Sequence, residues 1–336
     1  MPPLRVTHVH TCQHQRQIMK DPTTTCLFLC FVLPGVVMSL RNLYPLHAIY
    51  KPAVQDSAVP TASSNPLVVF VHGLDSSSRT WTATMEGLSL ACLAVDQRGC
   101  GESPLGDPQD FCQDALVQDL HDCIEQHAPK AEPPCRLVLV GHSLGGRIVL
   151  AYGAKYPQHA AAIVMEDMDI AVRNPTAHGI IQLKPCKGVF SQGYATQAAA
   201  VQALLDVGYP QNFVDKALAT DRLQQRSDGT WWSHVNPDFR KLCYPNILST
   251  SKGKTDCQTL ATQSSTSSQK IPVHVLVAGT EGTVCSEESL QEMRKILAAE
   301  DQLTIHRFPT AGHSIHSTAP DEYMAVLRNI IRDCAY

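Results

Sequence analysis

The sequence predicts an α/β protein built on a mostly parallel, doubly wound sheet. Two observations support this fold class. Short runs of β-branched and other apolar residues alternate along the chain with longer segments whose apolar residues recur at helical spacing. Most short runs are apolar throughout, which is typical of strands covered by helices on both faces. At 336 residues, the chain can hold one large domain of this class with an insertion, or two small domains.

The first half of the chain shows this alternation clearly. Residues 43–52 alternate enough to form an early edge strand, and residues 66–74 form a continuous apolar run ending in glycine, as expected of a buried strand. Serines suited to capping precede a helical pattern in 76–88. Residues 91–103 predict a strand followed by a glycine-rich turn, and residues 107–127 a capped helix with apolar residues near helical spacing.

The alternation continues in the middle of the chain and resumes near the C-terminus. Residues 137–150 open as an apolar β run and close as a helix, which runs to about Tyr156. Further strands are expected at 160–170, 271–280 and 302–309, and further helices at 286–300 and 320–334. Parallel strands joined by helices form a sheet with helices on both sides.

A long insertion interrupts this pattern. Two helix-like segments occupy 195–208 and 210–223, and a Ser/Thr-rich stretch of low complexity follows at 249–270, where we expect a flexible loop. Helices inserted at this point would lie over the C-terminal edge of the sheet, where α/β proteins bind ligands. We therefore predict a helical cap at 174–270 and a core formed by 43–173 and 271–336.

The N-terminal extension, residues 1–42, is poor in acidic residues and contains an apolar stretch at 26–40. That stretch is shorter than the roughly 20 residues that span a bilayer. Three interpretations compete: an organelle transit peptide, a signal sequence or membrane anchor at 26–40, and an upstream extension before an internal start at Met38. The composition favours targeting to a mitochondrion or plastid over a cytoplasmic or membrane-anchored protein.

Charge and cysteine content exclude several classes of function. The formal net charge of −4 leaves no basic stripe, which argues against nucleic acid as a partner. The thirteen cysteines are scattered and odd in number, without a CxxC pair. Neither a disulfide framework nor a metal site is indicated, and reduced thiols in an intracellular compartment are the simpler interpretation.

A pentapeptide in the middle of the chain carries the strongest chemical signal. Gly141-His142-Ser143-Leu144-Gly145 fits G-x-S-x-G, with a predicted strand before it and a predicted helix after it. In that setting the serine hydroxyl projects from a strained turn, and flanking side chains would collide with the neighbouring strand and helix. The helix also directs its N-terminal amides at the site. We predict that Ser143 is a nucleophile.

A serine hydroxyl needs a base to become a good nucleophile. Two histidines follow the last predicted strand, His313 and His316. His313 is favoured because the glycine before it frees the backbone to aim the ring, whereas His316 is expected to pack beside it.

A third group must orient the imidazole and stabilise its charged form. The residues alone leave three candidates open for this acid. Asp167 ends the strand after the serine helix, Asp169 lies two residues later, and Glu281 occupies the turn after 271–279. Each preserves the chain order of serine, acid and histidine.

The remaining candidates concern the oxyanion and the substrate. The backbone amides of Leu74 and Leu144 are expected to receive the developing negative charge. His72 lies beside this loop, and Trp231 and Trp232 are candidates for lining an apolar acyl pocket. Plain core packing is an equally good interpretation of the tryptophan pair.

Four ordered motifs together resemble the α/β-hydrolase superfamily. They are HG at 72–73, D-x-R-G-x-G-x-S at 96–103, GHSLGG at 141–146 and AGH at 311–313. The resemblance covers about 43–336 apart from the insertion. It implies an α/β-hydrolase fold, a structural role for the turn after Asp96, and an oxyanion hole and nucleophile supplied by the first and third motifs.

Within that superfamily, the sequence is most similar to small YbfF-type esterases and their eukaryotic abhydrolase relatives. Those proteins carry their acid at the end of the strand after the serine helix and lack an aspartate in the later turn, as do VMEDMDI and AGTEGTV here. The resemblance therefore implies Asp167, with Asp169 and Glu281 as alternatives. The DGTWW segment also resembles the DG-x-W stretch of these esterases, whereas the doubled aspartate, Ser/Thr-rich loop and N-terminal extension depart from them.

These observations predict a serine hydrolase with a catalytic triad of Ser143, Asp167 and His313. It would cleave small carboxylic esters or thioesters through an acyl-enzyme intermediate, without a metal or organic cofactor. Because fold does not fix reaction, two alternatives stay open. One is a ligand-binding or receptor protein on a hydrolase fold. The other is a different serine-triad chemistry, that of cofactor-free haloperoxidases or carbon–carbon bond hydrolases. Membrane contact through 26–40 is a further hypothesis.

Overall fold

The computed structural model describes residues 44–54, 65–128, 135–174, 193–220, 222–266, 270–279, 283–298 and 302–334. The chain divides into two compact units, Met1–Asn42 and Leu43–Tyr336. The first unit lies outside the described residues, as do the predictions made for 1–42 and 26–40. Among the described residues, no helix combines the length and apolar character needed to cross a bilayer.

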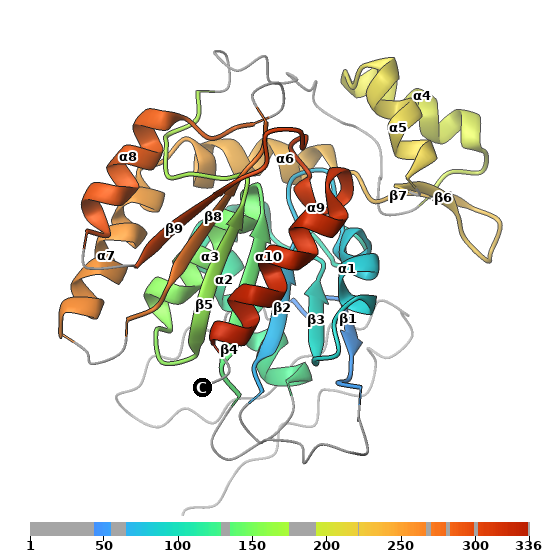
Figure 1. Cartoon of the computed structure of the whole chain (residues 1–336). Helices are drawn as coiled ribbons and strands as arrows, with labels where there is room; N and C mark the ends of the chain where they lie inside the picture. Colours follow the sequence, from blue (N-terminus) through green and yellow to red (C-terminus); the bar gives the residue numbers. More distant parts are fainter. Residues whose placement is uncertain are drawn as a thin grey trace, which may run out of the picture. The chain divides into compact units, whose positions relative to one another are not determined.

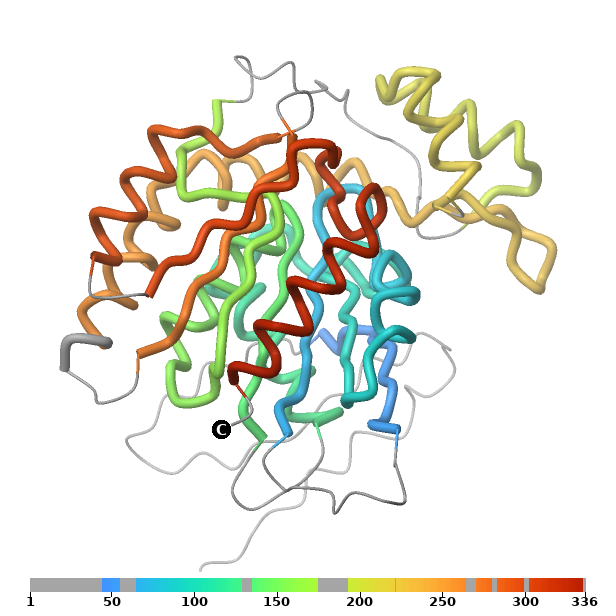
Figure 2. The backbone as a smooth tube through the Cα atoms, in the orientation of Figure 1, coloured from blue at the N-terminus to red at the C-terminus, as the bar shows by residue number. Residues whose placement is uncertain are grey.

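The second unit is organised around a seven-stranded sheet (Figures 1 and 2). The edge strand β1 pairs with β3 in antiparallel fashion, and every other pairing in this sheet is parallel. In spatial order the strands are β1 (Ala48–Lys51), β3 (Cys92–Val95), β2 (Leu67–Val71), β4 (Leu137–His142), β5 (Ala160–Glu166), β8 (Val273–Val277) and β9 (Leu303–Arg307). The predicted fold class, a mostly parallel α/β sheet, is confirmed.

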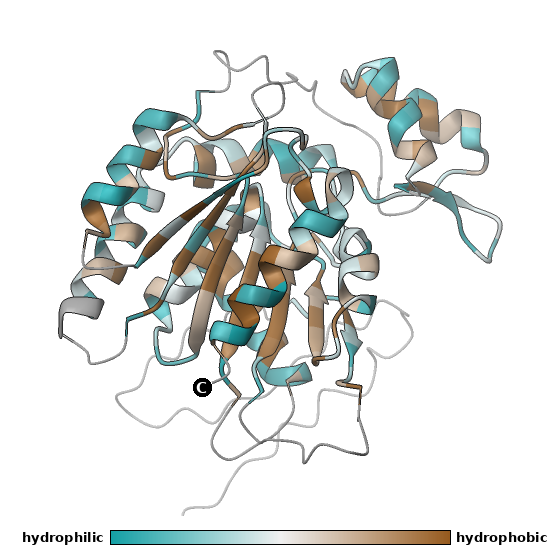
Figure 3. Ribbon diagram, in the orientation of Figure 1, coloured by the Kyte–Doolittle hydropathy of each residue, from teal (hydrophilic) through white to brown (hydrophobic). Residues whose placement is uncertain are grey.

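Helices cover both faces of the sheet. Because successive residues of a strand point to opposite sides, a buried strand contributes side chains to two buried clusters. In β2, Leu67, Val69 and Val71 belong to one buried cluster, whereas Val68 and Phe70 belong to the other. The first cluster includes residues of α2 (Gln113–His127), α3 (Leu144–Lys155) and α8 (Glu287–Ile296), and the second includes residues of α1 (Thr82–Glu86) and α10 (Pro320–Asp333). Figure 3 shows brown strands between helices whose outer turns are largely teal.

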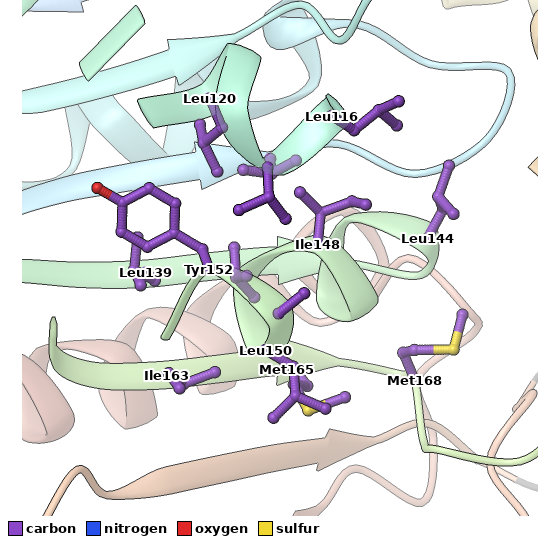
Figure 4. Packing of buried hydrophobic residues seen from close by; sticks show 14 of the residues in the cluster. Leu116, Leu120, Leu139, Leu144, Ile148, Leu150, Tyr152, Ile163, Met165 and Met168 are labelled. Carbon is purple, nitrogen blue, oxygen red and sulfur yellow. The ribbon is translucent and has the colours of Figure 1, made fainter. Parts of the chain in front are cut away.

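Helix α3 begins just after the central strand β4 and is buried over almost its whole length. Every residue from Leu144 to Ala154 is buried. Figure 4 shows side chains of this helix, among them Ile148 and Tyr152, packed with Leu139 of β4 and Met165 of β5. This packing fixes the N-terminus of α3 relative to the carboxyl ends of the two strands.

The insertion contains two structural parts. The first has its own small buried cluster, which includes Leu204, Val214 and Val235. Its elements are α4 (Gln197–Val207), α5 (Gln211–Ala219) and the antiparallel pair β6 (Leu223–Gln225) and β7 (Trp231–Ser233). The two helices expected at 195–208 and 210–223 are therefore present.

The second part of the insertion packs against the core and contributes buried residues to the main core cluster. It comprises α6 (Pro237–Cys243), the π-helical turn Tyr244–Leu248 and α7 (Lys252–Thr266). Cys257 and Leu260 of α7 are buried in the main core cluster. The predicted flexible loop was thus wrong for 252–266, because two apolar residues three positions apart dock a helix that its polar composition disguised. Shorter elements complete the chain: turns of 3₁₀-helix at Ser78–Trp81 and Pro108–Asp110, and α9 (Ile315–Thr318).

Candidate active site

Ser143 occupies a strained turn between β4 and α3. Its φ of 52° and ψ of −122° lie outside the regions that residues with a side chain prefer. A Cβ atom at Gly141 would lie 2.2 Å from the carbonyl oxygen of Gly145, and one at Gly145 would lie 2.2 Å from that of Val71. Only glycine fits at these two positions, so the turn requires the G-x-S-x-G spacing.

Backbone strain recurs at the same edge of the sheet. The described non-glycine residues with positive φ are Asp75, Ser143 and Asp167, which lie in the loops after β2, β4 and β5. These three strands are neighbours in the sheet, in the order β2, β4, β5. Strained backbone concentrates at functional sites, where the surrounding structure holds it in place.

The loops after β5 and β9 bring Asp167 and His313 together. His313 Nδ1 donates to Asp167 Oδ2 over 2.6 Å. Asp167 also accepts hydrogen bonds from the Thr283 hydroxyl and from the backbone N–H groups of Ala278 and Val284. Burial raises the pKa of the Asp167 carboxyl, but these bonds outweigh it and leave the pKa below its ordinary value. The carboxylate is therefore charged at neutral pH.

Of the two alternative acids, Asp169 has partners other than this histidine. Asp169 forms an ion pair with Arg173 over 2.5 Å and accepts the backbone N–H of Ser286. Its side chain thus fixes the chain after β5 instead of contacting an imidazole. Glu281 lies outside the described residues.

His316, the rival base, is engaged in a separate buried network. Its Nδ1 donates to Glu166 over 2.7 Å, and its Nε2 lies 2.9 Å from the Thr80 hydroxyl. The Glu166 carboxylate is fully buried, and although burial raises its pKa, the charges and hydrogen bonds of the nearby histidines leave that pKa below its ordinary value. Both ring nitrogens of His316 have partners, and its ring packs against Trp81, with the ring centroids 4.3 Å apart.

His142 links the serine turn to the histidine loop. Its Nε2 donates to the backbone carbonyl of His313 over 3.0 Å. Because a carbonyl oxygen only accepts, the ring must carry its proton on Nε2. Burial lowers the pKa of His142 to about 3, which keeps the ring neutral. Sequence analysis assigned no role to His142 or to the Glu166–His316 pair.

Ser143 and His313 line one cavity of about 800 Å³. His313 is 34% exposed at its side chain, and its Nε2 has no hydrogen-bond partner within the described ranges. Nor does a hydrogen bond join Ser143 to His313 in the described part of the chain. Such bonds are often long before a substrate is bound. Phe213 and Lys216 of α5 contribute to the wall, so the first part of the insertion lines this cavity too.

Two backbone amides near Ser143 lack acceptors. Leu74 lines the cavity, and Leu144 is the first residue of α3. Across the described residues, neither N–H finds a hydrogen-bond partner. The first turn of a helix leaves such N–H groups free and carries partial positive charge, which suits an anionic oxygen.

Three predicted substrate contacts lie elsewhere. His72 Nδ1 donates to the Gly73 carbonyl and its Nε2 accepts the Gln97 N–H, so this buried ring ties two loops together. Trp231 packs on the insertion's own cluster, and Trp232 lies against His234 and Arg226. None of the three lines the cavity that holds Ser143. That these residues contact substrate stays a prediction, and the structure gives each of them internal bonds or packing instead of a place on this cavity wall.

The turn after β3 is held by Asp96. Its carboxylate accepts from His47 Nδ1 and from the backbone N–H groups of Ser78 and Glu102. The bonds to His47 and the two amides hold the pKa of Asp96 far below its usual range although burial opposes this. Within the described ranges, no group of three or more His, Cys, Asp or Glu side chains is arranged to hold a metal ion.

Comparison with known proteins identifies the family. The sequence profile described as the Alpha/beta hydrolase family matches residues 68–326, which is more than half of the chain. The chain belongs to the alpha/beta hydrolase family. The resemblance inferred from the four motifs is therefore confirmed, and esterases are among the relatives.

Individual relatives of this hydrolase are distant. It is 23% identical over 277 residues to the sn-1-specific diacylglycerol lipase ABHD11 of Mus musculus, covering 79% of this chain and 81% of that protein. It is 30% identical over 112 residues to esterase Rv0045c of Mycobacterium tuberculosis, covering 33% and 36%. Several curated relatives are matched over only 27–40% of their length.

Solved structures agree with the hydrolase fold. A marine microorganism esterase superimposes with a TM-score of 0.59 at 16% identity, covering 85% of this chain and 99% of that one. The E-2-(acetamidomethylene)succinate hydrolase gives a TM-score of 0.56 at 20% identity, covering 85% and 95%. At these identities the likeness concerns the fold alone.

Proposed function

We propose that the protein is a serine hydrolase that cleaves carboxylic esters or thioesters through an acyl-enzyme intermediate. Ser143 is the nucleophile, His313 the general base and acid, and Asp167 the group that orients the imidazole. One observation carries the proposal: the 2.6 Å bond from His313 Nδ1 to Asp167, with His313 and Ser143 on the wall of one cavity.

The hydrogen bond to Asp167 determines how His313 acts. With its proton on Nδ1, the neutral ring carries a lone pair on Nε2, which accepts the Ser143 proton as the hydroxyl oxygen attacks the carbonyl carbon. The imidazolium then protonates the leaving alcohol or thiol, and the acyl group stays on Ser143. In the second half, His313 removes a proton from water as the water oxygen attacks the acyl carbon. The imidazolium then returns that proton to the Ser143 oxygen as the acyl–oxygen bond breaks and the acid leaves.

The negative charge that develops on the carbonyl oxygen needs nearby donors. We assign this role to the backbone amides of Leu74 and Leu144, because both lack acceptors among the described residues. Loss of one such donor typically costs about 3 kcal/mol of transition-state stabilisation. The part of the insertion that carries α5 serves as a cap, since its side chains line the cavity that holds Ser143.

Relatives support a small-molecule substrate of this class. The curated names include an esterase, a protein phosphatase methylesterase and a diacylglycerol lipase, all hydrolases of ester bonds. The match to the diacylglycerol lipase covers most of both chains, which makes it the broadest support among these three.

Active-site labelling tests the proposal directly. A fluorophosphonate probe should label Ser143, and the label should disappear in Ser143→Ala but persist in Ser317→Ala, a matched serine on the same cavity wall. The wild-type protein should hydrolyse p-nitrophenyl esters or acyl-CoA thioesters. Tight ligand binding without labelling or turnover would instead establish a receptor on a hydrolase fold.

A further inference from the structure

The cavity that holds Ser143 has an excess of positive side chains. Among its described lining residues are four cations, Arg173, Lys216, Arg222 and Arg240, and one carboxylate, Asp75. Two of the four are neutralised within the protein. Arg240 forms an ion pair with Asp75, and Arg173 forms one with Asp169.

The other two cations have no counter-ion among the residues that the structure describes. Lys216 lies on α5 and Arg222 lies between α5 and β6, on the cavity wall that the cap provides. In the described part of the chain, neither side chain takes part in a hydrogen bond or ion pair. Asp75 acts on Arg222 only at longer range, and it is already bonded to Arg240 and to the Tyr209 hydroxyl.

Of these two cations, Arg222 gives the stronger evidence for an anion-binding site. Lys216 is exposed, and a solvated surface lysine needs no partner. Arg222 is half-buried, and burial lowers the pKa of its guanidinium. Desolvating a cation without pairing it is unfavourable, so an unpaired guanidinium in a pocket wall is suited to an anion that arrives with a ligand.

The chemistry of the two side chains limits the class of anionic group that could bind there. A guanidinium presents a planar fork of N–H donors that matches a carboxylate or a phosphate, and an ammonium adds a second positive charge. A volume of about 800 Å³ leaves room for a small molecule that reaches from Ser143 to the cap wall.

We propose that the substrate of this hydrolase is an ester or thioester that carries an anionic group, a carboxylate or a phosphate, bound by Arg222 and assisted by Lys216. The inference rests on the proposed function and specifies its substrate class. The anion binds at the cap wall while the reacting carbonyl lies at Ser143. The two cations also attract such substrates from solution, an effect that salt weakens.

Matched substrate pairs test the inference. One pair is mono-p-nitrophenyl suberate and p-nitrophenyl octanoate, which differ only in a terminal carboxylate on the acyl chain. The other is S-acetyl-4′-phosphopantetheine and S-acetylpantetheine, which differ only in a phosphate on the leaving group. We expect kcat/KM to favour the anionic member of one pair, and added salt to reduce that preference. Which pair responds distinguishes a carboxylate from a phosphate.

Variants connect the preference to the residue. Arg222→Gln should lower the ratio of kcat/KM for the anionic over the neutral ester by about 10- to 100-fold, the range expected for a hydrogen bond to a charged group. Arg222→Lys, which keeps the charge but not the fork, should lose less. Arg226→Gln removes an equal charge from the cap at a residue that lies over Trp232 outside the cavity, and should leave the ratio unchanged.

The outcomes separate this inference from the proposed function. Hydrolysis of the neutral esters with no anionic preference in either pair, or a preference unchanged in Arg222→Gln, would overturn the anion site and leave the hydrolase standing. Absence of any hydrolysis and of fluorophosphonate labelling would count against the hydrolase. In that case, calorimetric binding of mono-p-nitrophenyl suberate and CoA to the protein tests the site without turnover. Binding lost in Arg222→Gln supports the site, and no binding, or equal binding by the variant, overturns it.

Discussion

Replacing Asp167 by asparagine removes the charge next to His313 while nearly preserving shape. Asp167 accepts four hydrogen bonds, two at each carboxylate oxygen. Asparagine offers one acceptor oxygen and one NH₂ donor, so in either orientation its NH₂ faces N–H groups that previously donated. If the NH₂ takes the position of Oδ2, the imidazole must move its proton to Nε2 and can no longer accept the serine proton.

The size of the effect follows from the lost charge pair. An imidazolium and a carboxylate with charge centres about 4 Å apart attract each other by about 4 kcal/mol at an effective dielectric constant of about 20. That energy corresponds to a rate factor of about 1,000. Because the His313 side chain is 34% exposed, water screens part of the interaction. We expect kcat to fall by about 100- to 1,000-fold.

The assay is steady-state hydrolysis of a p-nitrophenyl ester by Asp167→Asn and Asp169→Asn, with near-UV circular dichroism to show that both variants are folded. Asp169→Asn should lower the unfolding midpoint, since it breaks the ion pair with Arg173, but keep kcat within about tenfold of wild type. A folded Asp167→Asn protein with near wild-type kcat would refute the assignment of the acid.

Two further predictions concern the serine turn. In Gly145→Ala the new Cβ would lie 2.2 Å from the Val71 carbonyl oxygen, which is backbone and cannot move aside, so we expect a loss of about 2 kcal/mol or more in the free energy of unfolding, measured by denaturant titration. Gly87→Ala, whose Cβ would meet a methionine methyl group at 3.0 Å and two backbone carbonyl oxygens at 3.5 Å, should cost less, and equal losses would contradict the clash. The pKa of His142 falls from its ordinary 6.5 to about 3 on folding, so between these values the unfolded chain binds one more proton and stability decreases as pH falls, by about 1.4 kcal/mol per pH unit. His142→Gln should reduce the slope of unfolding free energy between pH 6 and 4 by that amount, and an unchanged slope would show that the ring is not buried in its neutral form.

The fold was predictable wherever a local pattern reports the environment. Strands such as β2 are apolar on both faces because helices cover both faces. The sequence pattern predicts such a strand without knowledge of which helices pack against it. Helix α7 was missed because its polar, Ser/Thr-rich surface dominates the composition. The buried Cys257 and Leu260 indicate a docked face, and so few apolar residues are a weak signal.

The candidate site likewise contains residues that a local sequence pattern predicts and residues that only the fold brings together. Ser143 is flanked by Gly141 and Gly145 and lies between a predicted strand and a predicted helix, so a short local stretch of sequence predicts its turn. The Glu166–His316 pair joins positions 150 residues apart, and nothing local in an apolar strand announces that its last residue will be a buried carboxylate. The choice of Asp167 over Asp169 came from resemblance, since both acids follow the same strand and only their partners, His313 and Arg173, differ.

Asp75 joins two parts of the molecule that are otherwise described separately. Its carboxylate bonds to Tyr209 of the cap and to Arg240, while the residue before it in the chain, Leu74, carries the amide that we propose as an oxyanion donor. Opening of the cap would therefore either break the bond to Tyr209 or move the loop that holds this proposed donor. Under the proposed function, Asp75 would then couple entry of substrate to the position of the oxyanion donor.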